Sequence, residues 1–339
     1  MTSTHIDVNA IDLGGLGAWM DAKGLPGGPI TGTAPVAGGT QNVMVRFERG
    51  GSTYILRRPP QHARRKSNEV LRREARLLAA LRDTRVPAPR LVAAQTEHEP
   101  VFYLMEPVDG FNPSLGLPDP HASDPAIRHR MGLEAAAALA ELGRVDPGVL
   151  PGFGRPDGFL ERQVPRWLGE LDSYGRLDGY PGPDIPHLAE TAGWLERHRP
   201  ATFTPGVMHG DYHFANLMFA HDSPRVAAIV DWEMSTIGDP LLDLGWLVAM
   251  WPANDGHVPG LPSPREIVDC YGALSERDLS ALDWYAVLAC FKLGIVLEGT
   301  HARAFAGQAP KEIGDLLHTT TLTLFGRARQ IMDGLLDEG

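Results

Sequence analysis

A polar loop between two short apolar runs constrains the fold of this chain more than any other stretch. The run VMHGDYHFANLMF, residues 207–219, holds two histidines, an aspartate and an asparagine. It could form a metal site, a catalytic loop, or a hydrogen-bonded corner. His209 and His213 would face the same way only in a helix, which Gly210 and the β-like flanks disfavour. A zinc hydrolase that used both histidines would need further ligands. No HExxH, CxxC or third nearby histidine completes such a set.

The spacing within the loop favours a catalytic role. Asn216 follows Asp211 by five positions, and His209 lies two residues before Asp211, which gives the pattern H-x-D-x-x-x-x-N. In phosphotransfer loops with this pattern the aspartate accepts the proton of the attacking hydroxyl, and the asparagine offers an oxygen to Mg²⁺. We therefore predict Asp211 as the catalytic base and Asn216 as a magnesium ligand.

A second carboxylate follows on the next apolar strand. Mg²⁺ takes oxygen ligands but few of them from protein, because it keeps waters and phosphate oxygens. The run RVAAIVDWE ends a predicted strand at Asp231, fifteen residues after Asn216. Asp231 is therefore the predicted second protein ligand, while Glu233 could contact a second ion or be solvated. The agreement of loop, strand and carboxylate is more specific than any one of them.

Composition and charge exclude several classes of protein. The net charge of −11 disfavours a nucleic-acid binder, since phosphate backbones are held by clustered Lys and Arg. Cys270 and Cys290 offer neither a disulfide framework nor a CxxC spacing, which favours a reducing, cytoplasmic location. The N-terminus shows no secretory signal. The run LLDLGWLVAMW is too short to cross a membrane and carries Asp243, so no membrane partner is expected. The oligomeric state cannot be inferred from these features.

The pattern of expected elements divides the chain into two parts. Alternating apolar residues around a Gly-Gly turn predict a hairpin near residues 43–56, and a charged amphipathic helix follows at 66–82. With two further strands they form a small β-rich lobe, residues 1–107, that begins with a short helix. Residues 108–339 are expected to be mainly helical. Helices are predicted at 124–144, 158–176 and 187–198, with three more within 263–336, and one small hairpin is formed by LMF and RVAAIV.

The segments HGDYHFANLMF and IVDWEMSTIGDPLLDLGWL resemble the signature segments of the aminoglycoside phosphotransferase and choline kinase-like family. The resemblance also covers the small lobe and so most of the chain from about Val36. Within that family the chain is similar to the phosphotransferase domains fused to some acyl-CoA dehydrogenases, through GGTQN, YILRRPP and FYLMEPVDG. It implies an α+β, bilobal protein kinase-like fold, with ATP and Mg²⁺ as cofactors and a small-molecule hydroxyl as acceptor.

The resemblance further implies a nucleotide site in the small lobe. Arg57 stands where the family has a lysine that holds the α- and β-phosphates, with Glu74 as its expected partner. Arginine keeps the charge but is bulkier, so the site could instead belong to a nucleotide-binding pseudokinase or regulatory module. A surface Arg–Glu pair is the simpler alternative. The other implied nucleotide contacts are a phosphate-covering loop, Gly38, Gly39, Thr40, Gln41 and Asn42, and an adenine-binding hinge, Glu106 and Val108.

Two residues are implied to support the catalytic loop. Asp243 lies among leucines and Trp246, where an unpaired charge would be costly. By resemblance, it braces the loop through backbone hydrogen bonds, while His209 orients its neighbours. Asp239 is expected to cap the helix that follows it.

The acceptor stays open at this point. Hydroxyacyl-CoA thioesters, amino alcohols, sugars and aminoglycosides are all candidates. Eight basic residues fall between Arg57 and Arg76. A solvated helix face is the simplest interpretation of them, and a patch that holds a polyanionic acceptor such as a CoA thioester is the alternative.

Overall fold

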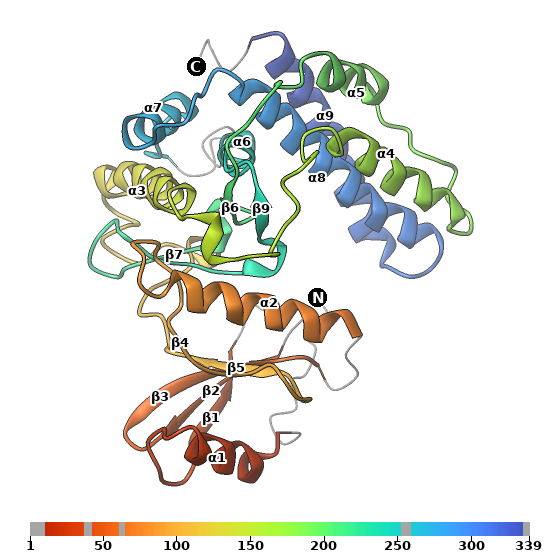
Figure 1. Cartoon of the computed structure of the whole chain (residues 1–339). Coiled ribbons are helices and arrows are strands. Elements are labelled where there is room, and N and C mark those ends of the chain that lie inside the picture. Colours follow the sequence, from red (N-terminus) through yellow and green to blue (C-terminus); the bar gives the residue numbers. More distant parts are fainter. Residues whose placement is uncertain (1–10, 37–42, 61–64, 252–258, 335–339) are drawn as a thin grey trace.

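The computed structural model describes residues 11–36, 43–60, 65–251 and 259–334. Figure 1 shows a small lobe with the N-terminal sheet and a larger helical lobe. The predicted α+β architecture with two lobes is confirmed. Among the described residues, none of the helices combines the length and the apolar composition that a membrane crossing requires.

The small lobe is built on a five-stranded antiparallel sheet with strand order β1-β2-β3-β5-β4. The predicted hairpin is confirmed, because Val45 pairs with Leu56 and Phe47 with Tyr54. Gly50 has a positive φ of 58° in the turn, a conformation that glycine adopts without steric cost. The five strands are β1 (Thr31–Pro35), β2 (Val43–Arg49), β3 (Ser52–Arg58), β4 (Leu91–Gln95) and β5 (Phe102–Met105).

Two helices cover opposite faces of this sheet (Figure 1). Helix α1 (Leu13–Ala22) buries Leu16 and Met20 against one face. Helix α2 (Arg65–Leu81) lies between the other face and the large lobe, and its Leu71 is fully buried. The predicted lobe boundary at residue 107 falls just after β5, where the chain leaves the sheet.

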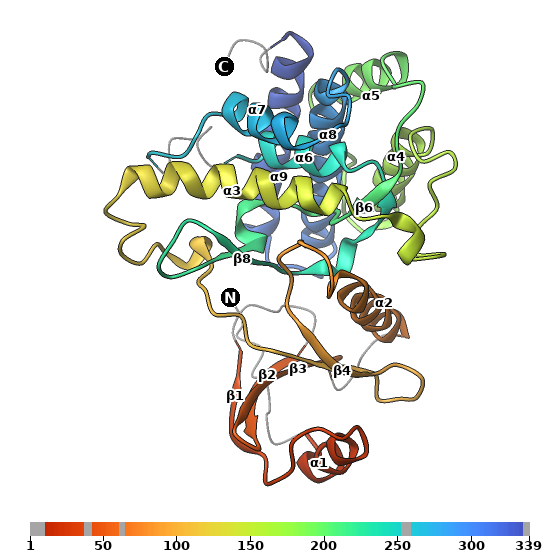
Figure 2. The same ribbon diagram turned by 60° about the vertical axis from the view of Figure 1, so that its left-hand side comes forward.

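Helices form most of the large lobe, and α8 lies at its centre, because α8 packs against α4, α5, α6 and α9. Figure 2 shows α3 across this lobe, and it contacts β6 and β8. The three helices predicted in the last third of the chain are confirmed as α7, α8 and α9. The helices are α3 (Pro125–Gly143), α4 (Gln163–Ser173), α5 (Leu188–Arg197), α6 (Leu241–Ala249), α7 (Pro264–Leu274), α8 (Leu282–Phe305) and α9 (Lys311–Met332).

Helix α4 begins later than predicted. The expected start at Gly158 is wrong, because this glycine has φ +64° and residues up to Arg162 form turns. The Arg162 guanidinium donates to the carbonyls of Arg155 and Asp157, which stabilises this non-helical entrance. Regular helix starts only at Gln163.

Two short pairs of antiparallel strands lie in the large lobe, and one of them is a hairpin. The predicted one is confirmed, because β7 (Leu217–Phe219) pairs with β8 (Val226–Ile229). The second, β6 (Gly206–Met208) with β9 (Thr236–Gly238), was not predicted. This pair joins segments that are far apart in the sequence, with β7 and β8 between them, so no local turn pattern indicates it.

Candidate active site

The loop between β6 and β7 brings Asp211 and Asn216 together. It ends in a short 3₁₀ turn, η5 (Phe214–Asn216), which reverses the chain into β7. The Asn216 side-chain amide donates to the Asp211 backbone carbonyl at 2.9 Å and to its carboxylate Oδ2 at 3.0 Å. With Nδ2 used in this way, Oδ1 of Asn216 is the side-chain atom left to accept or to coordinate.

His209 holds the loop through its ring and its backbone. Its Nε2 lies 2.9 Å from the Val230 carbonyl, and its Nδ1 accepts from the Asp211 amide at 3.3 Å. Burial lowers the pKa of His209 to about 4, although the Val230 carbonyl and the Asp211 charge favour the protonated form. A neutral ring with both nitrogens engaged by backbone groups orients the loop and offers no lone pair to zinc.

Asp243 lies beneath the loop on α6 and is almost fully buried. Its carboxylate accepts from the His209 amide at 2.6 Å and from the Gly210 amide at 2.8 Å. Burial raises the pKa of Asp243 to about 7, against the lowering effect of these two amides and of Lys292. The carboxylate therefore fixes the backbone that precedes Asp211.

Gly210 is the position where the loop needs glycine. Its φ is +84°, and a Cβ there would lie 2.4 Å from the Met234 carbonyl oxygen. Its own carbonyl accepts from Lys292 Nζ at 2.8 Å. Lys292 is buried in α8, with its ammonium 4.5 Å from the centre of the Trp246 ring. This ammonium supports the loop from the side opposite the solvent.

The Asp211 carboxylate is kept ionised by its surroundings. Burial alone would raise its pKa, but His213, whose Nε2 lies 3.4 Å from Oδ2, outweighs burial together with His209 and Lys292. The net effect is a pKa for Asp211 below the ordinary aspartate value. An ionised carboxylate with partial solvent access is suited to accept a proton.

Asp231 reaches the same region from β8. The Val230 amide donates to the Asn216 carbonyl at 2.9 Å, so the end of β8 lies against the end of the loop. Asp231 then takes a left-handed backbone conformation, φ 65°, at the start of the turn η6 (Trp232–Met234), and its side chain is 46% exposed. Asp231 and Asn216 line the same cavity, and a carboxylate with an amide oxygen is a donor set of the kind that Mg²⁺ prefers.

Arg57 and Glu74 form a buried pair across the small lobe. Arg57 Nε and Nη2 donate to the two oxygens of Glu74 at 2.9 and 2.7 Å, and the Tyr103 hydroxyl donates to Glu74 at 3.0 Å. Arg57 Nη2 also lies 3.7 Å from Asp231 Oδ1. Burial would lower the pKa of Arg57, but Tyr103, Glu74 and Asp231 together raise it. The interpretation as a surface Arg–Glu pair is therefore wrong.

A cavity of about 950 Å³ lies between the lobes, and Asp211 is not among its lining residues but bonds Asn216, which is. This volume is within the range of small-molecule and cofactor sites. Of the implied nucleotide residues, Arg57, Glu74, Glu106 and Val108 line it, as do the implied metal ligands Asn216 and Asp231. The implied phosphate-covering loop, Gly38, Gly39, Thr40, Gln41 and Asn42, lies outside the described residues.

We expect Arg57→Met to raise the KM for nucleotide at least tenfold, because it removes a cation from the cavity wall and leaves Glu74 buried without its partner. Arg57→Lys keeps the charge but loses the two-point contact, so a smaller increase is expected. The measurement is the KM for nucleotide, obtained from initial rates over a range of nucleotide concentrations. Arg265→Met removes an exposed arginine that pairs with Asp269, and serves as the control. A KM for Arg57→Met equal to that of the control would contradict the role of Arg57.

The basic residues of α2 do more than face solvent. Arg73 Nη2 donates to the carbonyls of Phe153 at 2.8 Å and Ser235 at 3.0 Å, and Arg76 donates to the carbonyl of Pro151. These bonds fasten α2 to the large lobe, so the simplest interpretation, a solvated helix face, is wrong for Arg73, whereas Arg76 is exposed. Such contacts join residues 75 to 162 positions apart, which a sequence pattern does not reveal.

Lys292 was also missed. Its signal is visible afterwards, because a single lysine interrupts the apolar run YAVLACFKLGIVL in the middle of α8. A buried lysine needs a polar partner. The sequence does not indicate that this partner is the Gly210 carbonyl of the catalytic loop. Asp239, by contrast, accepts from the Leu241 amide at 3.0 Å, as expected of a capping residue at the start of α6.

Comparison with known proteins identifies the family and agrees with the fold. Residues 32–283 match the family model described as "Phosphotransferase enzyme family". Acyl-CoA dehydrogenase family member 11 of Homo sapiens is 27% identical over 293 residues, which cover 81% of this chain and 36% of that protein. The same-named protein of Gallus gallus is 28% identical over 296 residues, 81% of this chain and 37% of that protein. The chain thus spans about a third of the length of these relatives.

Solved structures show the same fold. A putative aminoglycoside phosphotransferase from Ralstonia eutropha JMP134 is 26% identical, with a TM-score of 0.77 over 94% of this chain and 98% of that chain. The GDP complex of aminoglycoside 2′-phosphotransferase-IIIa is 18% identical, with a TM-score of 0.62 over 92% and 99% of the two chains. The implied kinase-like fold is confirmed. The chain belongs to the phosphotransferase enzyme family, that of the aminoglycoside phosphotransferases.

Proposed function

We propose that this chain is an ATP- and Mg²⁺-dependent kinase that transfers the γ-phosphate to a hydroxyl group of a small molecule. The observation that carries the proposal is that Asn216 and Asp231 both line the interlobe cavity, and that Asp211 is joined to them through its contact with Asn216. Asn216 lines that cavity and also bonds the Asp211 carboxylate. A base beside a pair of oxygen ligands is the arrangement that phosphoryl transfer to an alcohol requires.

Each residue has a separate role in this proposal. Asp211 accepts the proton of the acceptor hydroxyl while the hydroxyl oxygen attacks the γ-phosphorus and ADP leaves. Asn216 Oδ1 and the Asp231 carboxylate would hold Mg²⁺, which supplies charge neutralisation on the phosphate oxygens. Arg57, fixed by Glu74, adds positive charge to the cavity wall. Glu106 and Val108, at the start of the interlobe connection, contact the base of the nucleotide.

The protein contributes mostly positioning and electrostatic stabilisation. Phosphoryl transfer needs little covalent help, so correct placement of nucleotide and acceptor supplies most of the rate. The hydrogen bonds from the loop backbone to Asp243, and from Lys292 to the Gly210 carbonyl, hold the base in place before substrates bind. Preorganisation of this kind avoids reorganisation during the reaction.

The acceptor class is the open part of the proposal. The curated relatives include acyl-CoA dehydrogenase family members, and the similar solved structures include aminoglycoside phosphotransferases, a macrolide phosphotransferase and an ethanolamine kinase. We propose hydroxyacyl-CoA thioesters first, with amino alcohols, sugars and aminoglycosides as alternatives. We also propose a cytoplasmic location, which suits the two cysteines, both unpaired.

An ATP-consumption screen over these acceptor classes tests the function. Wild-type protein with ATP and Mg²⁺ should show acceptor-dependent release of ADP with at least one class, and Asp211→Asn serves as the blank. Omission of Mg²⁺ should abolish the signal. Nucleotide binding without turnover on any class would instead favour a regulatory pseudokinase. Acceptor-dependent turnover without any divalent ion would contradict the roles of Asn216 and Asp231.

A further inference from the structure

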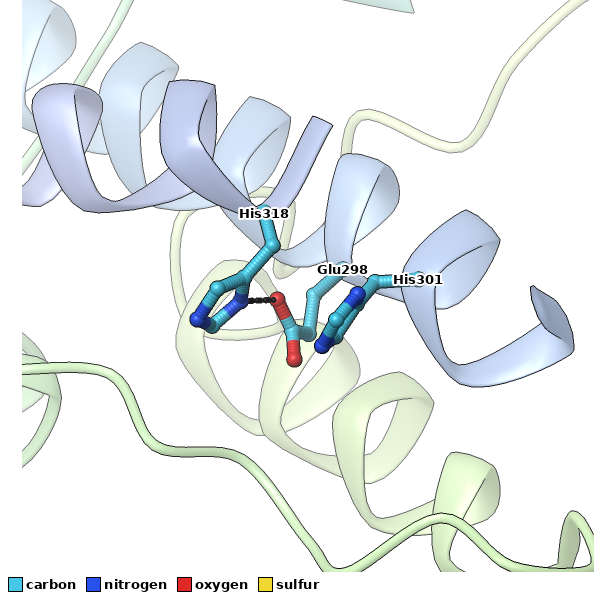
Figure 3. Close-up of side chains that lie close together, drawn as sticks. All are labelled: Glu298, His301 and His318. Atoms are coloured by element: carbon cyan, nitrogen blue, oxygen red, sulfur yellow. Dashed lines mark hydrogen bonds and ion pairs between the residues drawn. The ribbon is translucent and has the colours of Figure 1, made fainter. Parts of the chain in front are cut away.

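Three metal-binding side chains meet at the far end of the large lobe, where α8 and α9 run side by side. Glu298 and His301 lie one turn apart on α8, and His318 faces them from α9 (Figure 3). One carboxylate oxygen of Glu298 and one ring nitrogen of each histidine all lie within 4.8 Å of one another. This is the one such group of three among the residues that the structure describes.

The three side chains are already held in place. His318 Nδ1 lies 2.7 Å from Glu298 Oε2, and the two imidazole rings stack with their centres 4.3 Å apart. The Tyr180 hydroxyl donates to the other oxygen of Glu298 at 2.7 Å. Glu298 is fully buried, and the side chains of His301 and His318 are 13% and 21% exposed. The cluster is therefore oriented and enclosed, but solvent reaches its rim.

One buried polar atom of the cluster has no hydrogen-bond partner. His301 Nδ1 is enclosed by protein, and it makes no hydrogen bond among the described residues. It lies 3.7 Å from Asp315 Oδ1, too far for a hydrogen bond, and Asp315 is paired with Lys311. A buried ring nitrogen without a partner is costly unless a ligand or an ion completes its surroundings.

We propose that Glu298, His301 and His318 form a binding site for a divalent transition metal ion, with Zn²⁺ as the expected occupant. Two imidazoles and one carboxylate suit Zn²⁺ and its neighbours, whereas Mg²⁺ and Ca²⁺ take oxygen ligands. A fourth position remains for water. This site is separate from the nucleotide cavity and does not depend on the proposed kinase activity, because none of its ligands lines that cavity.

The geometry needs only a small adjustment to accept the ion. Tetrahedral Zn²⁺ with bonds of about 2.0–2.2 Å places its ligand atoms about 3.3 Å apart. The His318–Glu298 contact would open slightly, and His301 would close in toward it. The ion would lie between His318 and Glu298, where a hydrogen bond of 2.7 Å now joins them. Tyr180 would keep the carboxylate oriented, as groups outside the ligand set commonly do.

Zinc titration of chelator-treated protein without a histidine tag tests the site. Isothermal titration calorimetry should show one equivalent of Zn²⁺ bound to the wild type, and His301→Gln and His318→Gln should each lose that binding. Tyr180→Phe should weaken the affinity by about 10–100-fold, because it frees the carboxylate. Excess Mg²⁺ should not compete. Circular dichroism and the thermal midpoint in chelator show whether each variant is folded.

Matched controls separate this site from other histidines. His187 pairs with Glu190 at 3.0 Å in an exposed His–Glu contact, so His187→Gln should bind zinc as the wild type does. His213→Gln and Asp231→Asn should also retain it, since neither residue belongs to the cluster. Absence of stoichiometric binding by the wild type would overturn the proposal, and so would undiminished binding by both cluster variants. Weakened binding by folded Tyr180→Phe supports it even if a histidine variant does not fold.

Discussion

Asp211→Asn is expected to lower kcat by about 10²–10⁴, the usual contribution of a general base, while nucleotide affinity stays within a few-fold of wild type. Asparagine is isosteric, so its carbonyl oxygen can still accept from the Asn216 amide. It cannot accept the proton of the acceptor hydroxyl. The measurement is kcat with the best acceptor from the screen, together with nucleotide binding by calorimetry.

An exposed aspartate outside the cavity gives the matched control for this loss. Asp222 lies in the turn between β7 and β8, and Asp222→Asn should keep the wild-type kcat. The lowered pKa of Asp211 adds a second readout. The acid limb of the wild-type kcat/KM profile should lie below the ordinary titration range of an aspartate. Equal turnover by Asp211→Asn and wild type would remove Asp211 as the base.

Asp243→Ala is expected to destabilise the protein by about 3–5 kcal/mol, the range for breaking a buried charged network. The substitution leaves the amides of His209 and Gly210 buried without an acceptor, and Lys292 loses one of the two carboxylates, Asp211 and Asp243, that favour its charged form. The measurement is the free energy of unfolding of the full chain, obtained from urea titration. A drop in kcat should accompany it, because the backbone before Asp211 loses its support.

Controls separate the network from general surface effects. Asp269 is exposed and pairs with Arg265, so Asp269→Ala should change stability by no more than about 0.5 kcal/mol. In a double-mutant cycle, Asp243→Ala with Lys292→Met should cost less than the sum of the single changes, since neither charge is then left alone. A cost for Asp243→Ala equal to that of Asp269→Ala would show that the hydrogen bonds contribute nothing.

The raised pKa of Asp243 gives this residue a pH signature. Its pKa rises from 3.8 to about 7 on folding, so the folded chain holds a proton that the unfolded chain has lost in that window. The contribution to stability is fully present below about pH 4 and is lost as the pH rises through about 7. Asp243→Asn should lack this decline. The measurement is the free energy of unfolding of the wild type and of Asp243→Asn as a function of pH.

Much of the fold could be predicted from local pattern. The alternation of Val43, Val45 and Phe47 before a glycine turn specified a hairpin, because successive side chains of a strand lie on opposite faces of the sheet. The helices in the last third of the chain carry long apolar stripes that specify them equally well. The pairing of β6 with β9 was not predicted. The strands β6 and β9 have three residues each, and their pairing depends on contacts that tertiary structure supplies.

The candidate site divides in the same way. Asp211 and Asn216 are found by spacing, because a single loop positions both. Asp231 is found because a strand leads into it. Lys292 lies 82 residues beyond Gly210, whose carbonyl it contacts, and no local pattern encodes that meeting. The cluster on α8 and α9 was missed for the same reason, since Glu298 and His318 meet only once the two helices pack together.

The hydrogen bond from Arg73 to the Ser235 carbonyl has a consequence for turnover. Ser235 comes just after the turn that starts at Asp231, so the small lobe holds the segment that carries a proposed magnesium ligand. A hinge motion that separates the lobes would pull on that segment or break the bond. Opening of the lobes to release the nucleotide product would then also disturb the proposed magnesium site, so that the nucleotide and the ion would leave together.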